Sequence, residues 1–286
     1  MVDLTVSIIS NDNRDLVLKC IESVYGCAEG LALEVIVIEN ASTDGSEGAI
    51  RQGFQDVRLI VNEVKEGFSA NHNKAIRAAS GSFVFLLNDD TVVHKGALRL
   101  MVEFMRANPA AGAAGGFLIN PDGTPQLTGR ATPTLAAAAM VSLGLHRLFP
   151  DNPVTSKYYR KQETFPGPVE VESINGSAVM LRKDAAEKVG LLDEGFFLFC
   201  EDVDLSIRLR KAGYRLYLLP DSKVTHYRGK STGGRRMVWV YHRSLLRFYR
   251  KHFAKDRPFL LNLLVYVGIY LRFIVYWLYG NVRKRA

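Results

Sequence analysis

The first ninety residues alternate apolar runs with segments in which apolar side chains recur every three or four positions. Four runs predict β-strands, at residues 4–9, 35–38, 57–61 and 82–87. Three intervening segments predict helices, at residues 15–25, 44–52 and 68–79. The β-branched run 35–38 is typical of a strand that is buried on both faces. This order predicts an α/β domain with a mostly parallel central sheet and helices on both faces.

The pattern is less regular further along the chain. Residues 120–168 are rich in Pro and Gly, with an apolar stretch at 135–145 and a basic aromatic cluster at 157–160. They predict a long excursion over the sheet edge, which suits ordinary surface loops and an acceptor-binding flap equally well. Regular structure is predicted to return at residue 169, with helices at 184–190 and 202–212 and a strand at 217–220.

Two helices are predicted at the C-terminal end. Residues 237–253 carry Arg and Lys at helical spacing among aromatic side chains, and residues 259–282 are almost wholly apolar, interrupted by Asn262 and Arg272. The apolar segment is long enough to span a bilayer, but an Arg near its middle is costly in lipid. A helix lying in the membrane interface, with Arg272 extending to the headgroups, is therefore favoured. A hairpin packed on the main domain or on a dimer partner is the alternative.

The charge is divided unevenly along the chain. The net charge is +8, yet residues 228–286 hold 14 of the 37 Lys and Arg residues and only one of the 29 acidic residues. This division predicts a catalytic domain at residues 1–227 and a basic, aromatic-rich, membrane-associating helical segment at 228–286. An anionic membrane surface is the expected partner of that segment, and the basic residues 283–285 would face the cytoplasm.

The three cysteines, Cys20, Cys27 and Cys200, have no metal-ligand spacing and form a poor disulfide framework. Reduced thiols in the cytosol are expected. The first residues lack the basic and apolar regions of a signal peptide, so none is predicted.

Acidic residues follow an apolar run at Asn88-Asp89-Asp90. Carboxylates at the end of a buried strand must be paired, solvated or bound to a cation. We expect Asp90 to bind Mg²⁺ or Mn²⁺ bridging a nucleoside diphosphate, because these ions prefer carboxylate and phosphate oxygens. Asp89 is expected to accept hydrogen bonds from ribose hydroxyls, and Glu39 from a base N–H. The alternative is a helix-capping turn before a helix at 95–105.

A second acidic cluster lies at residues 200–204. Asp202, at a predicted helix N-terminus, suits a general base that takes the proton of an acceptor hydroxyl, and Glu201 is expected to bind the acceptor. Asp204 is expected to cap the helix or to pair with Arg208 four residues later. His226 precedes a Gly-rich basic loop, 228–234, and suits a further metal ligand, with the loop over the diphosphate. A lone histidine also fits a purely structural role.

Segments 35–46, 66–73, 87–91 and 197–205 together resemble family 2 glycosyltransferases, nearest to the rhamnosyltransferase-like branch. The motifs occur in family order over residues 6–231. The resemblance implies a GT-A fold with a Rossmann-like N-terminal half, a dTDP- or UDP-sugar donor, a divalent cation and inversion at the anomeric carbon. Carried over by position, it implies nucleotide-sugar-binding residues at Ser10, Glu39, Asn73, Asn88 and Asp89. It implies metal-site residues at Asp90 and His226, and the base at Asp202.

Some positions depart from the family pattern. Glu39 stands where Asp is usual, and Ser10-Asn11-Asp12 stands where the first strand usually ends in Thr-Tyr-Asn, so an aromatic side chain near the base is missing. Asn88-Asp89-Asp90 often reads Asn-Pro-Asp in this branch. No Gln-x-x-Arg-Trp sequence is present, which speaks against a processive polysaccharide synthase.

The sequence therefore predicts an enzyme that moves one sugar, rhamnose, to a cell-envelope glycan or lipid-linked acceptor at the inner face of the membrane. Another donor sugar, such as galactofuranose, glucose or an N-acetylhexosamine, would use the same residues. A non-catalytic module that binds membrane or nucleic acid is disfavoured by the intact acidic sites, and no nucleic-acid partner is expected. A nicotinamide-binding domain is disfavoured because the turn at 10–13 lacks a Gly-rich phosphate loop. A homo-oligomer is left open.

Overall fold

The computed structural model describes residues 2–28, 30–132, 165–227 and 235–279, together with residues 134, 136, 137, 140, 148, 149 and 152–154. Four predicted features lie outside the described residues: most of the apolar stretch at 135–145, the aromatic cluster at 157–160, the loop at 228–234 and the basic end at 283–285. The predicted excursion at 120–168 is thus described at its two ends and at nine residues between them.

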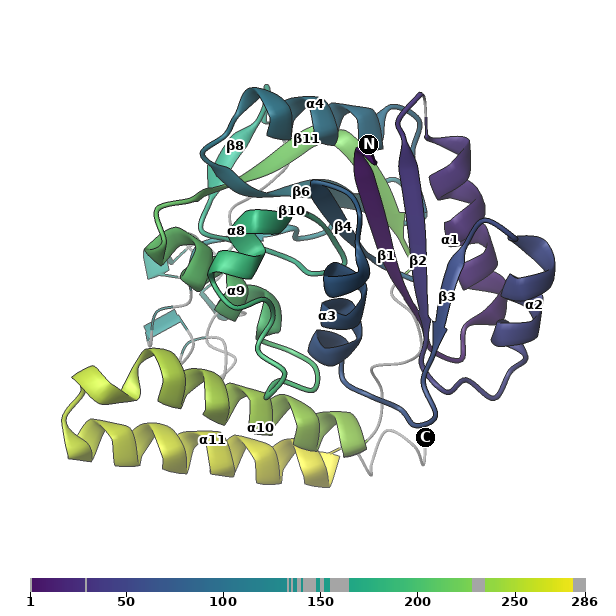
Figure 1. Cartoon of the computed structure of the whole chain (residues 1–286). Coiled ribbons are helices and arrows are strands. Elements are labelled where there is room, and N and C mark those ends of the chain that lie inside the picture. The colour runs from purple at the N-terminus through teal and green to yellow at the C-terminus, as the bar shows by residue number, and fades with distance from the viewer. Residues whose placement is uncertain are drawn as a thin grey trace.

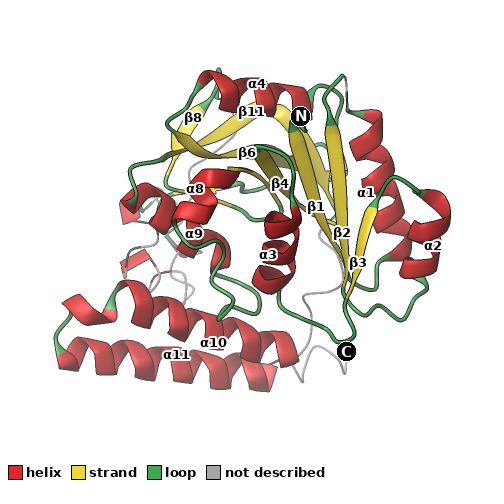
Figure 2. Cartoon of the chain, viewed as in Figure 1, coloured by secondary structure: helices red, strands yellow, loops and turns green. Residues whose placement is uncertain are grey.

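A nine-stranded mixed sheet forms the centre of the molecule (Figures 1 and 2). Its strands are β1 Leu4–Ser10, β2 Leu33–Glu39, β3 Arg58–Val61, β4 Phe83–Asn88, β5 Thr91–Val93, β6 Ala111–Ile119, β8 Val169–Val171, β10 Ala178–Arg182 and β11 Arg215–His226. The order is β3-β2-β1-β4-β10-β6-β11-β5, with β8 also paired to β11. The first four strands in this order are parallel, as predicted, whereas β10 is antiparallel to both of its neighbours.

Helices cover both faces of the sheet, as the alternation of strands and helices predicts. On one face α1 Arg14–Gly26, α2 Ser46–Gly53 and α4 Ala97–Ala107 share an apolar layer with alternate side chains of β1, β2 and β4, and within it α4 packs on β6 and β11. On the other face lie α3 Phe68–Ala78, α8 Lys183–Lys188 and α9 Glu201–Lys211. Burial on two faces explains why the predicted strands read as continuous apolar runs.

The strand register brings several predicted site residues to one edge of the sheet. Ser10 at the end of β1 is paired with Glu39 at the end of β2, and the neighbouring Ile9 is paired with Asn88 at the end of β4. β11 ends beside β5, where His226 is paired with Thr91, the residue after Asp90. The carboxyl ends of the strands thus gather residues that are far apart in the sequence.

Strand β6, with the sequence AGAAGGFLI, was not predicted. Its small side chains gave no strand signal, but they are required by packing: a Cβ on Gly115 would lie 2.6 Å from Cγ2 of Ile174. The predicted strand at 217–220 is only a part of the first half of a much longer strand, β11, which has irregular register on β6. Short strands β7 Gly129–Arg130 and β9 Ser173–Ile174 pair separately beside the sheet.

The C-terminal segment forms a helical hairpin, α10 Arg235–His252 and α11 Phe259–Tyr279, whose helices lie side by side along one end of the domain (Figure 1). Helix α10 packs on the domain through Phe248, which contacts Phe196 and Ile207. Ser244 Oγ also donates a hydrogen bond of 2.7 Å to the carbonyl of Leu198. The alternative of a hairpin packed on the main domain is therefore observed.

Candidate active site

A cavity of about 940 Å³ lies between the carboxyl ends of the strands, the N-terminus of α9 and the helical hairpin. Six of the predicted site residues line it: Asn88, Asp89, Asp90, Glu201, Asp202 and His226. The two acidic clusters, more than one hundred residues apart in the sequence, therefore share one space. A cavity of this size and position is typical of a ligand site in an α/β sheet.

Asp89 is buried and organises the loop after β1. Its carboxylate accepts hydrogen bonds from the backbone N–H of Asn11 at 3.0 Å and from Nδ2 of Asn13 at 3.2 Å. Burial, and then the nearby charge of Asp90, raise the pKa of Asp89 to about 7. The loop held in this way forms one wall of the cavity, with Asn11, Asp12 and Asn13 lining it.

Asp90 and His226 are in contact, with Nε2 of His226 3.2 Å from Oδ1 of Asp90. The other ring nitrogen of His226 lies 3.0 Å from Oε1 of Gln126. The amide of Gln126 is oriented by its Nε2, which donates to the carbonyl of His226 at 2.7 Å and to Oδ1 of Asn120 at 2.8 Å. Oε1 must therefore accept, so Nδ1 of His226 carries a hydrogen, and Nε2 is the ring nitrogen that is left to ligate a cation beside Asp90.

A neutral imidazole nitrogen beside a carboxylate oxygen is a donor pair that suits a divalent cation, so these residues fit the metal that the family resemblance implies. Within the described residues no group of three or more His, Cys, Asp or Glu side chains is arranged around a metal position. Two protein ligands are enough for Mg²⁺ or Mn²⁺ when phosphate oxygens and water complete the coordination.

The turn before α9 is strained. Phe199 and Cys200 have φ values of +72° and +69°, in the left-handed region that costs non-Gly residues about 1–3 kcal/mol each. Neighbouring elements hold the turn: the carbonyl of Phe197 accepts a hydrogen bond of 2.7 Å from the N–H of Phe68, and the ring of Phe199 packs on Tyr241 of α10. The strained turn sets the direction in which α9 begins, with its first two residues at the cavity.

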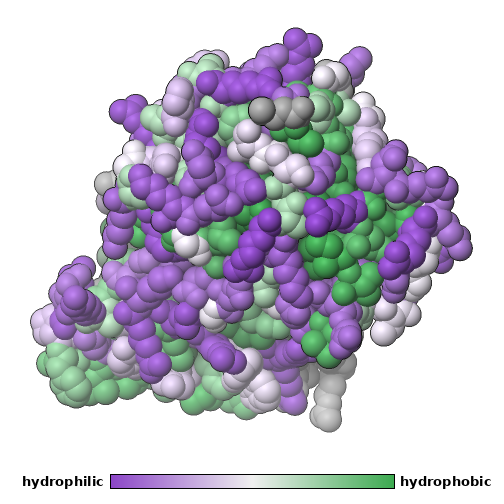
Figure 3. All heavy atoms as spheres, in the orientation of Figure 1, coloured by the Kyte–Doolittle hydropathy of each residue, from purple (hydrophilic) through white to green (hydrophobic). Residues whose placement is uncertain are grey.

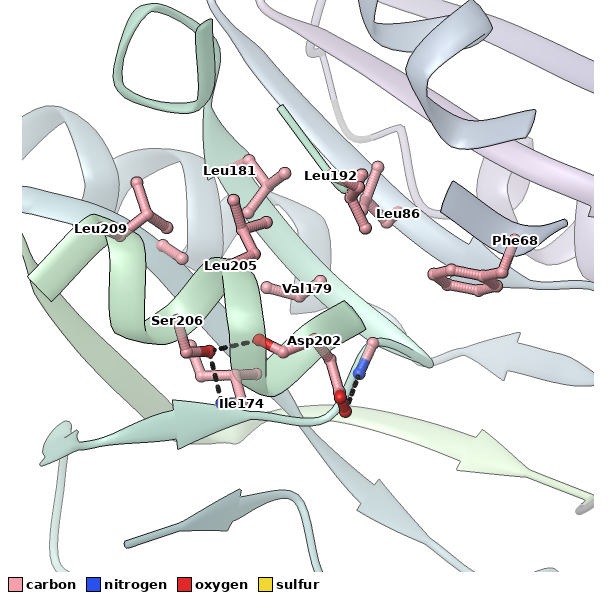
Figure 4. Close-up of a pocket in the computed structure, with 12 residues that line it drawn as sticks. Phe68, Leu86, Ile174, Val179, Leu181, Leu192, Asp202, Leu205, Ser206 and Leu209 are labelled. Atoms are coloured by element: carbon pink, nitrogen blue, oxygen red, sulfur yellow. Dashed lines mark hydrogen bonds between the residues drawn. The ribbon is translucent and has the colours of Figure 1, made fainter. Parts of the chain in front are cut away.

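Asp202 lies at the border between the cavity and the apolar core. Its Oδ2 accepts a hydrogen bond of 3.4 Å from the N–H of Gly176, and behind it lies a small void of about 20 Å³ (Figure 4). The void is lined mainly by apolar side chains, among them Phe68, Val179 and Leu205. Burial raises the pKa of Asp202, and the positive charge of Arg130 opposes the rise. A carboxylate with a raised pKa is a stronger base than one in water.

Glu201 is 5% exposed and lines the same cavity. Its Oε2 makes no hydrogen bond to the described part of the chain. Burial, and then the charge of Asp202, raise the pKa of Glu201 well above its usual value. The raised pKa favours the protonated form of Glu201, and its unbonded Oε2 lies at the cavity, where a bound molecule can reach it.

Three of the predicted nucleotide-binding residues lie behind the cavity wall. Ser10 is fully buried, and the carboxylate of Glu39 accepts a hydrogen bond of 2.9 Å from the N–H of Ser42, within its own loop. The amide of Asn73 binds the segment after α8: Nδ2 donates to Leu192 O, and Oδ1 accepts from the Leu192 N–H at 3.0 Å. The structure thus places these three side chains where they support the wall.

Asp204 was expected to cap the helix or to pair with Arg208. It is fully buried and lies 2.8 Å from the guanidinium of Arg208, so the predicted pairing is confirmed. It also contacts Lys251 and His252 of α10, each at 2.7 Å. Asp204 therefore joins the helix that carries Asp202 to the helical hairpin.

Several cavity residues were missed by sequence reasoning. Asn40 and Lys65 line it near the loop after β1, and Lys65 forms an ion pair with Asp12. Arg130 lines it near Asp202, and Gln126 orients His226 from behind. Asn40 lies within the motif at 35–46 but was assigned no role there, whereas Lys65, Gln126 and Arg130 belong to no motif or apolar pattern and are brought to the site only by the fold.

The sheet and cavity define a glycosyltransferase of the GT-A fold. The mannosyltransferase of Pyrobaculum calidifontis, solved with GDP-Man and Mn²⁺, superposes with a TM-score of 0.60 at 17% sequence identity. The match covers 98% of this chain and 73% of the mannosyltransferase chain. At this identity the likeness concerns the fold alone.

Residues 5–190 match glycosyl transferase family 2, and the chain belongs to this family. It is 30% identical over 212 residues to the N-acetylglucosaminyl-diphospho-decaprenol L-rhamnosyltransferase of Mycobacterium tuberculosis, covering 70% of this chain and 68% of that protein. It is 23% identical over 268 residues to the rhamnosyltransferase WbbL of Escherichia coli, covering 89% and 96%. The predicted family and its rhamnosyltransferase-like branch are confirmed.

Proposed function

We propose that the protein transfers a single rhamnose from a dTDP- or UDP-linked donor to a lipid-linked acceptor of the cell envelope, with inversion at the anomeric carbon. The observation that carries this proposal is the shared cavity, in which the Asp202 carboxylate faces the same space as the Asp90–His226 pair. The choice of sugar and acceptor is supported by the two rhamnosyltransferases to which the chain is similar.

In this proposal Asp202 acts as the general base. Its carboxylate takes the proton from an acceptor hydroxyl, and the hydroxyl oxygen forms a bond to the anomeric carbon on the face opposite the diphosphate. The bond between the anomeric carbon and the diphosphate oxygen breaks, and its electron pair leaves with the nucleoside diphosphate. Protonated Glu201 donates a hydrogen bond to the acceptor and so orients it.

Asp90 and His226 would hold the divalent cation, Mg²⁺ or Mn²⁺. When bound, the cation neutralises the negative charge that develops on the departing diphosphate. Gln126 keeps His226 in the tautomer that leaves Nε2 available. Asn88 and Asp89 hold the sugar nucleotide, and the neighbouring Asn11, Asn40 and Lys65 complete its site, above the wall supported by Ser10, Glu39 and Asn73.

The proposal also places the protein on the inner face of the cell membrane through the helical hairpin. Helix α11 contains one segment, Phe259–Leu278, that is long and apolar enough to cross a bilayer, with a mean hydropathy of 1.9. Its outer face is apolar and exposed, at Phe259, Leu260, Leu263, Leu264, Val267, Tyr270, Leu271, Ile274, Val275 and Leu278. Figure 3 shows apolar surface along the lower edge of the molecule, where α11 lies.

A lipid surface suits this face because apolar side chains lie beside a strongly basic helix, α10, and the inner leaflet is anionic. Arg272, in the middle of α11, lies on the opposite face and packs on Tyr241 of α10. The charge that argued against burial in lipid therefore points into the protein, and the helix lies flat with its apolar side in the interface.

The test is a transfer assay with a panel of labelled donors and N-acetylglucosaminyl-diphospho-polyprenol in anionic vesicles. We expect rhamnose transfer that needs Mn²⁺ or Mg²⁺, and a product of opposite anomeric configuration by NMR. Asp202→Asn should lower kcat by about 10²–10⁴-fold, because the base is lost. Transfer of galactofuranose, glucose or an N-acetylhexosamine instead would overturn the choice of donor, and a product of retained configuration would overturn the mechanism.

A further inference from the structure

Two arginines of the helical hairpin, Arg236 of α10 and Arg272 of α11, line the cavity together with Arg130. The remaining charged residues of the cavity are mostly acidic, notably Asp89, Asp90, Glu201 and Asp202. Neither hairpin arginine forms an ion pair with a carboxylate in the described part of the chain. Their guanidinium groups lie over aromatic rings instead. The hairpin therefore gives the cavity a cationic side, formed by Arg236 and Arg272, while Arg130 lies with the acidic groups near Asp202.

Arg272 is held in place without using all of its donors. Its guanidinium lies 5.1 Å from the ring of Tyr241 and 5.0 Å from the ring of Tyr276, and Nη1 donates to the hydroxyl of Tyr241 at 3.4 Å. The Nε–H is buried and makes no hydrogen bond within the described residues. A buried donor without an acceptor is unfavourable, so this geometry suits a guanidinium that is completed by a ligand.

Arg236 is held in a similar way. Its guanidinium lies 5.9 Å from the ring of Phe197, in the segment that leads to Asp202. Two guanidinium groups fixed by aromatic rings present planar sets of N–H donors, and such sets match the oxygens of a phosphate. A diphosphate is therefore the class of ligand that the cationic side of the cavity fits best.

Two substrates of the proposed reaction carry a diphosphate, the nucleotide donor and the lipid-linked acceptor. Helix α11 favours the acceptor, because the helix that carries Arg272 on its inner face carries the exposed apolar surface on its outer face. A helix is about 10–12 Å across, so a headgroup beside α11 is within reach of the cavity while its chain stays in lipid.

We infer that Arg236 and Arg272 form a binding site for the diphosphate of a polyprenyl-linked acceptor. This inference rests on the proposed function, because it assigns the acceptor's diphosphate to the hairpin side of the same cavity. The hairpin then has two tasks: it places the protein on the membrane, and it selects acceptors that carry phosphate.

The test uses geranylgeranyl diphosphate as the probe, with geranylgeraniol as the uncharged comparison, and measures binding to the full chain in detergent by titration calorimetry. Arg272→Gln and Arg236→Gln should each weaken binding of the diphosphate by about 10- to 100-fold, as expected for a lost hydrogen bond to a charged group. Arg272→Lys should retain part of the affinity. The alcohol should bind far more weakly than the diphosphate to the unaltered protein.

Arg243→Gln is the matched control. Arg243 is on the same helix as Arg236 and also stacks on an aromatic ring, 5.1 Å from Trp239, but it is exposed and does not line the cavity. Its replacement removes the same charge, so binding should stay within about twofold. Equal losses in all three variants would show only a general effect of charge and would overturn the inference.

A second titration, with dTDP or UDP and Mn²⁺, separates the two sources of diphosphate. We expect nucleotide binding to be unchanged in Arg236→Gln and Arg272→Gln. Weaker nucleotide binding with unaltered binding of geranylgeranyl diphosphate would assign the arginines to the donor and overturn the inference. Neither titration depends on turnover. The binding results can therefore be interpreted even if the protein does not transfer rhamnose.

Discussion

At the scale of single residues, the site depends on carboxyl groups that are kept apart in protonation. In the proposed reaction Asp202 is ionised so that it can accept a proton, while Glu201 beside it keeps its own. Burial raises the pKa of both, and the charge of Arg130 lowers that of Asp202. Arg130 is therefore the residue whose charge favours ionisation of Asp202 against the effect of burial.

Replacement of Arg130 by Gln should move the acidic limb of the kcat–pH profile to higher pH. The group that must be ionised is Asp202, and loss of the nearby positive charge raises its pKa further, so a higher pH is needed for the same rate. Arg130→Lys keeps the charge and should leave the limb nearer its original position. Steady-state kinetics across the pH range give the comparison, and a shift to lower pH would contradict the assignment.

Replacement of Gln126 should weaken metal binding. Gln126→Leu removes the acceptor for Nδ1 of His226, so the ring loses its fixed tautomer. Affinity for Mn²⁺ in the presence of a nucleoside diphosphate should fall by about 10–100-fold, the usual effect of losing a partner of a metal ligand. Mn²⁺ binding is followed by electron paramagnetic resonance.

Asn120→Ala is the control for this variant, because it removes only one acceptor of the Gln126 amide and leaves the contact with His226. Its effect should be smaller. An unchanged Mn²⁺ affinity in Gln126→Leu would remove His226 from the metal site.

The sequence identified the residues of the site that lie in short motifs. Asp89, Asp90 and Asp202 could be found because each stands at the end of a predicted strand or the start of a predicted helix. Gln126 and Arg130 could not, because their positions depend on a chain path through an irregular segment. Glu39 was expected to face the base, and that role stays a prediction; the contact of its carboxylate with the N–H of Ser42 is one that no sequence pattern reports.

At the scale of elements, the first turn of α9 is positioned by close contact with the start of α3. A Cβ on Gly67 would lie 2.7 Å from the carbonyl oxygen of Phe197 and 2.8 Å from its Cα. Both contacts are with backbone atoms, which cannot move aside as a flexible side chain does. The strained residues Phe199 and Cys200 follow directly, so any shift there reaches Asp202.

Gly67→Ala should therefore reduce both stability and activity, with a cost of roughly 1–3 kcal/mol in the free energy of unfolding. Gly48→Ala is the matched control, because Gly48 lies within α2 and has open space where its Cβ would be. That variant should be stabilised by about 0.5–1 kcal/mol. Thermal and urea unfolding measure both, and equal stability of the two variants would contradict the role of the close contact.

Helix α10 is attached to the domain through buried and half-buried acids. Burial opposes ionisation of Asp193, but hydrogen bonds from Lys251 and Arg247 outweigh it and lower the pKa of Asp193 to about 2. The stabilisation is thus fully present above the ordinary pKa of an aspartate, about 3.9, and is lost as the pH falls toward 2.

Asp193→Asn should accordingly lower Tm at neutral pH, and the difference from the unaltered protein should shrink as the pH falls from about 4 to about 2. Differential scanning calorimetry over this range gives the result. A difference in Tm that stays constant with pH would mean that the ionic contacts of Asp193 do not hold the hairpin.

At the scale of the whole molecule, charge and hydropathy are sorted between two parts. The domain that contains the cavity is mildly acidic, whereas the helical hairpin is basic on α10 and apolar on the outer face of α11. Because the hairpin also lines the cavity, attachment to a membrane would bring a lipid headgroup to the reacting groups.

Replacement of Leu264 and Leu271 by Gln should weaken binding to anionic vesicles at least tenfold, since these side chains are 61% and 58% exposed and would be buried in lipid. Val64→Gln is the control, because Val64 is 67% exposed but lies on the catalytic domain. Co-sedimentation with vesicles measures both. Undiminished binding in the double variant would show that α11 does not face the membrane.

The sequence predicted the arrangement of strands and helices in the N-terminal part of the chain, where the two alternate. Strands that are buried on both faces leave continuous apolar runs there, and these runs can be recognised. The sequence did not predict strand β6 at the centre of the sheet, because its first six residues are all Gly or Ala, among them Gly115, which fits against Ile174. The packing of α10 on Phe196 and Asp204 was likewise hidden, since it depends on contacts between distant segments.

The most direct test of the central claim is calorimetric binding of nucleotide sugars to the purified protein, with and without Mn²⁺, for the unaltered chain, Asp90→Ala and Asp202→Asn. We predict metal-dependent binding of one rhamnose donor, lost in Asp90→Ala and retained in Asp202→Asn, because only the first residue holds the metal. Binding of that donor with equal affinity in the absence of metal, or its retention in Asp90→Ala, would contradict the account.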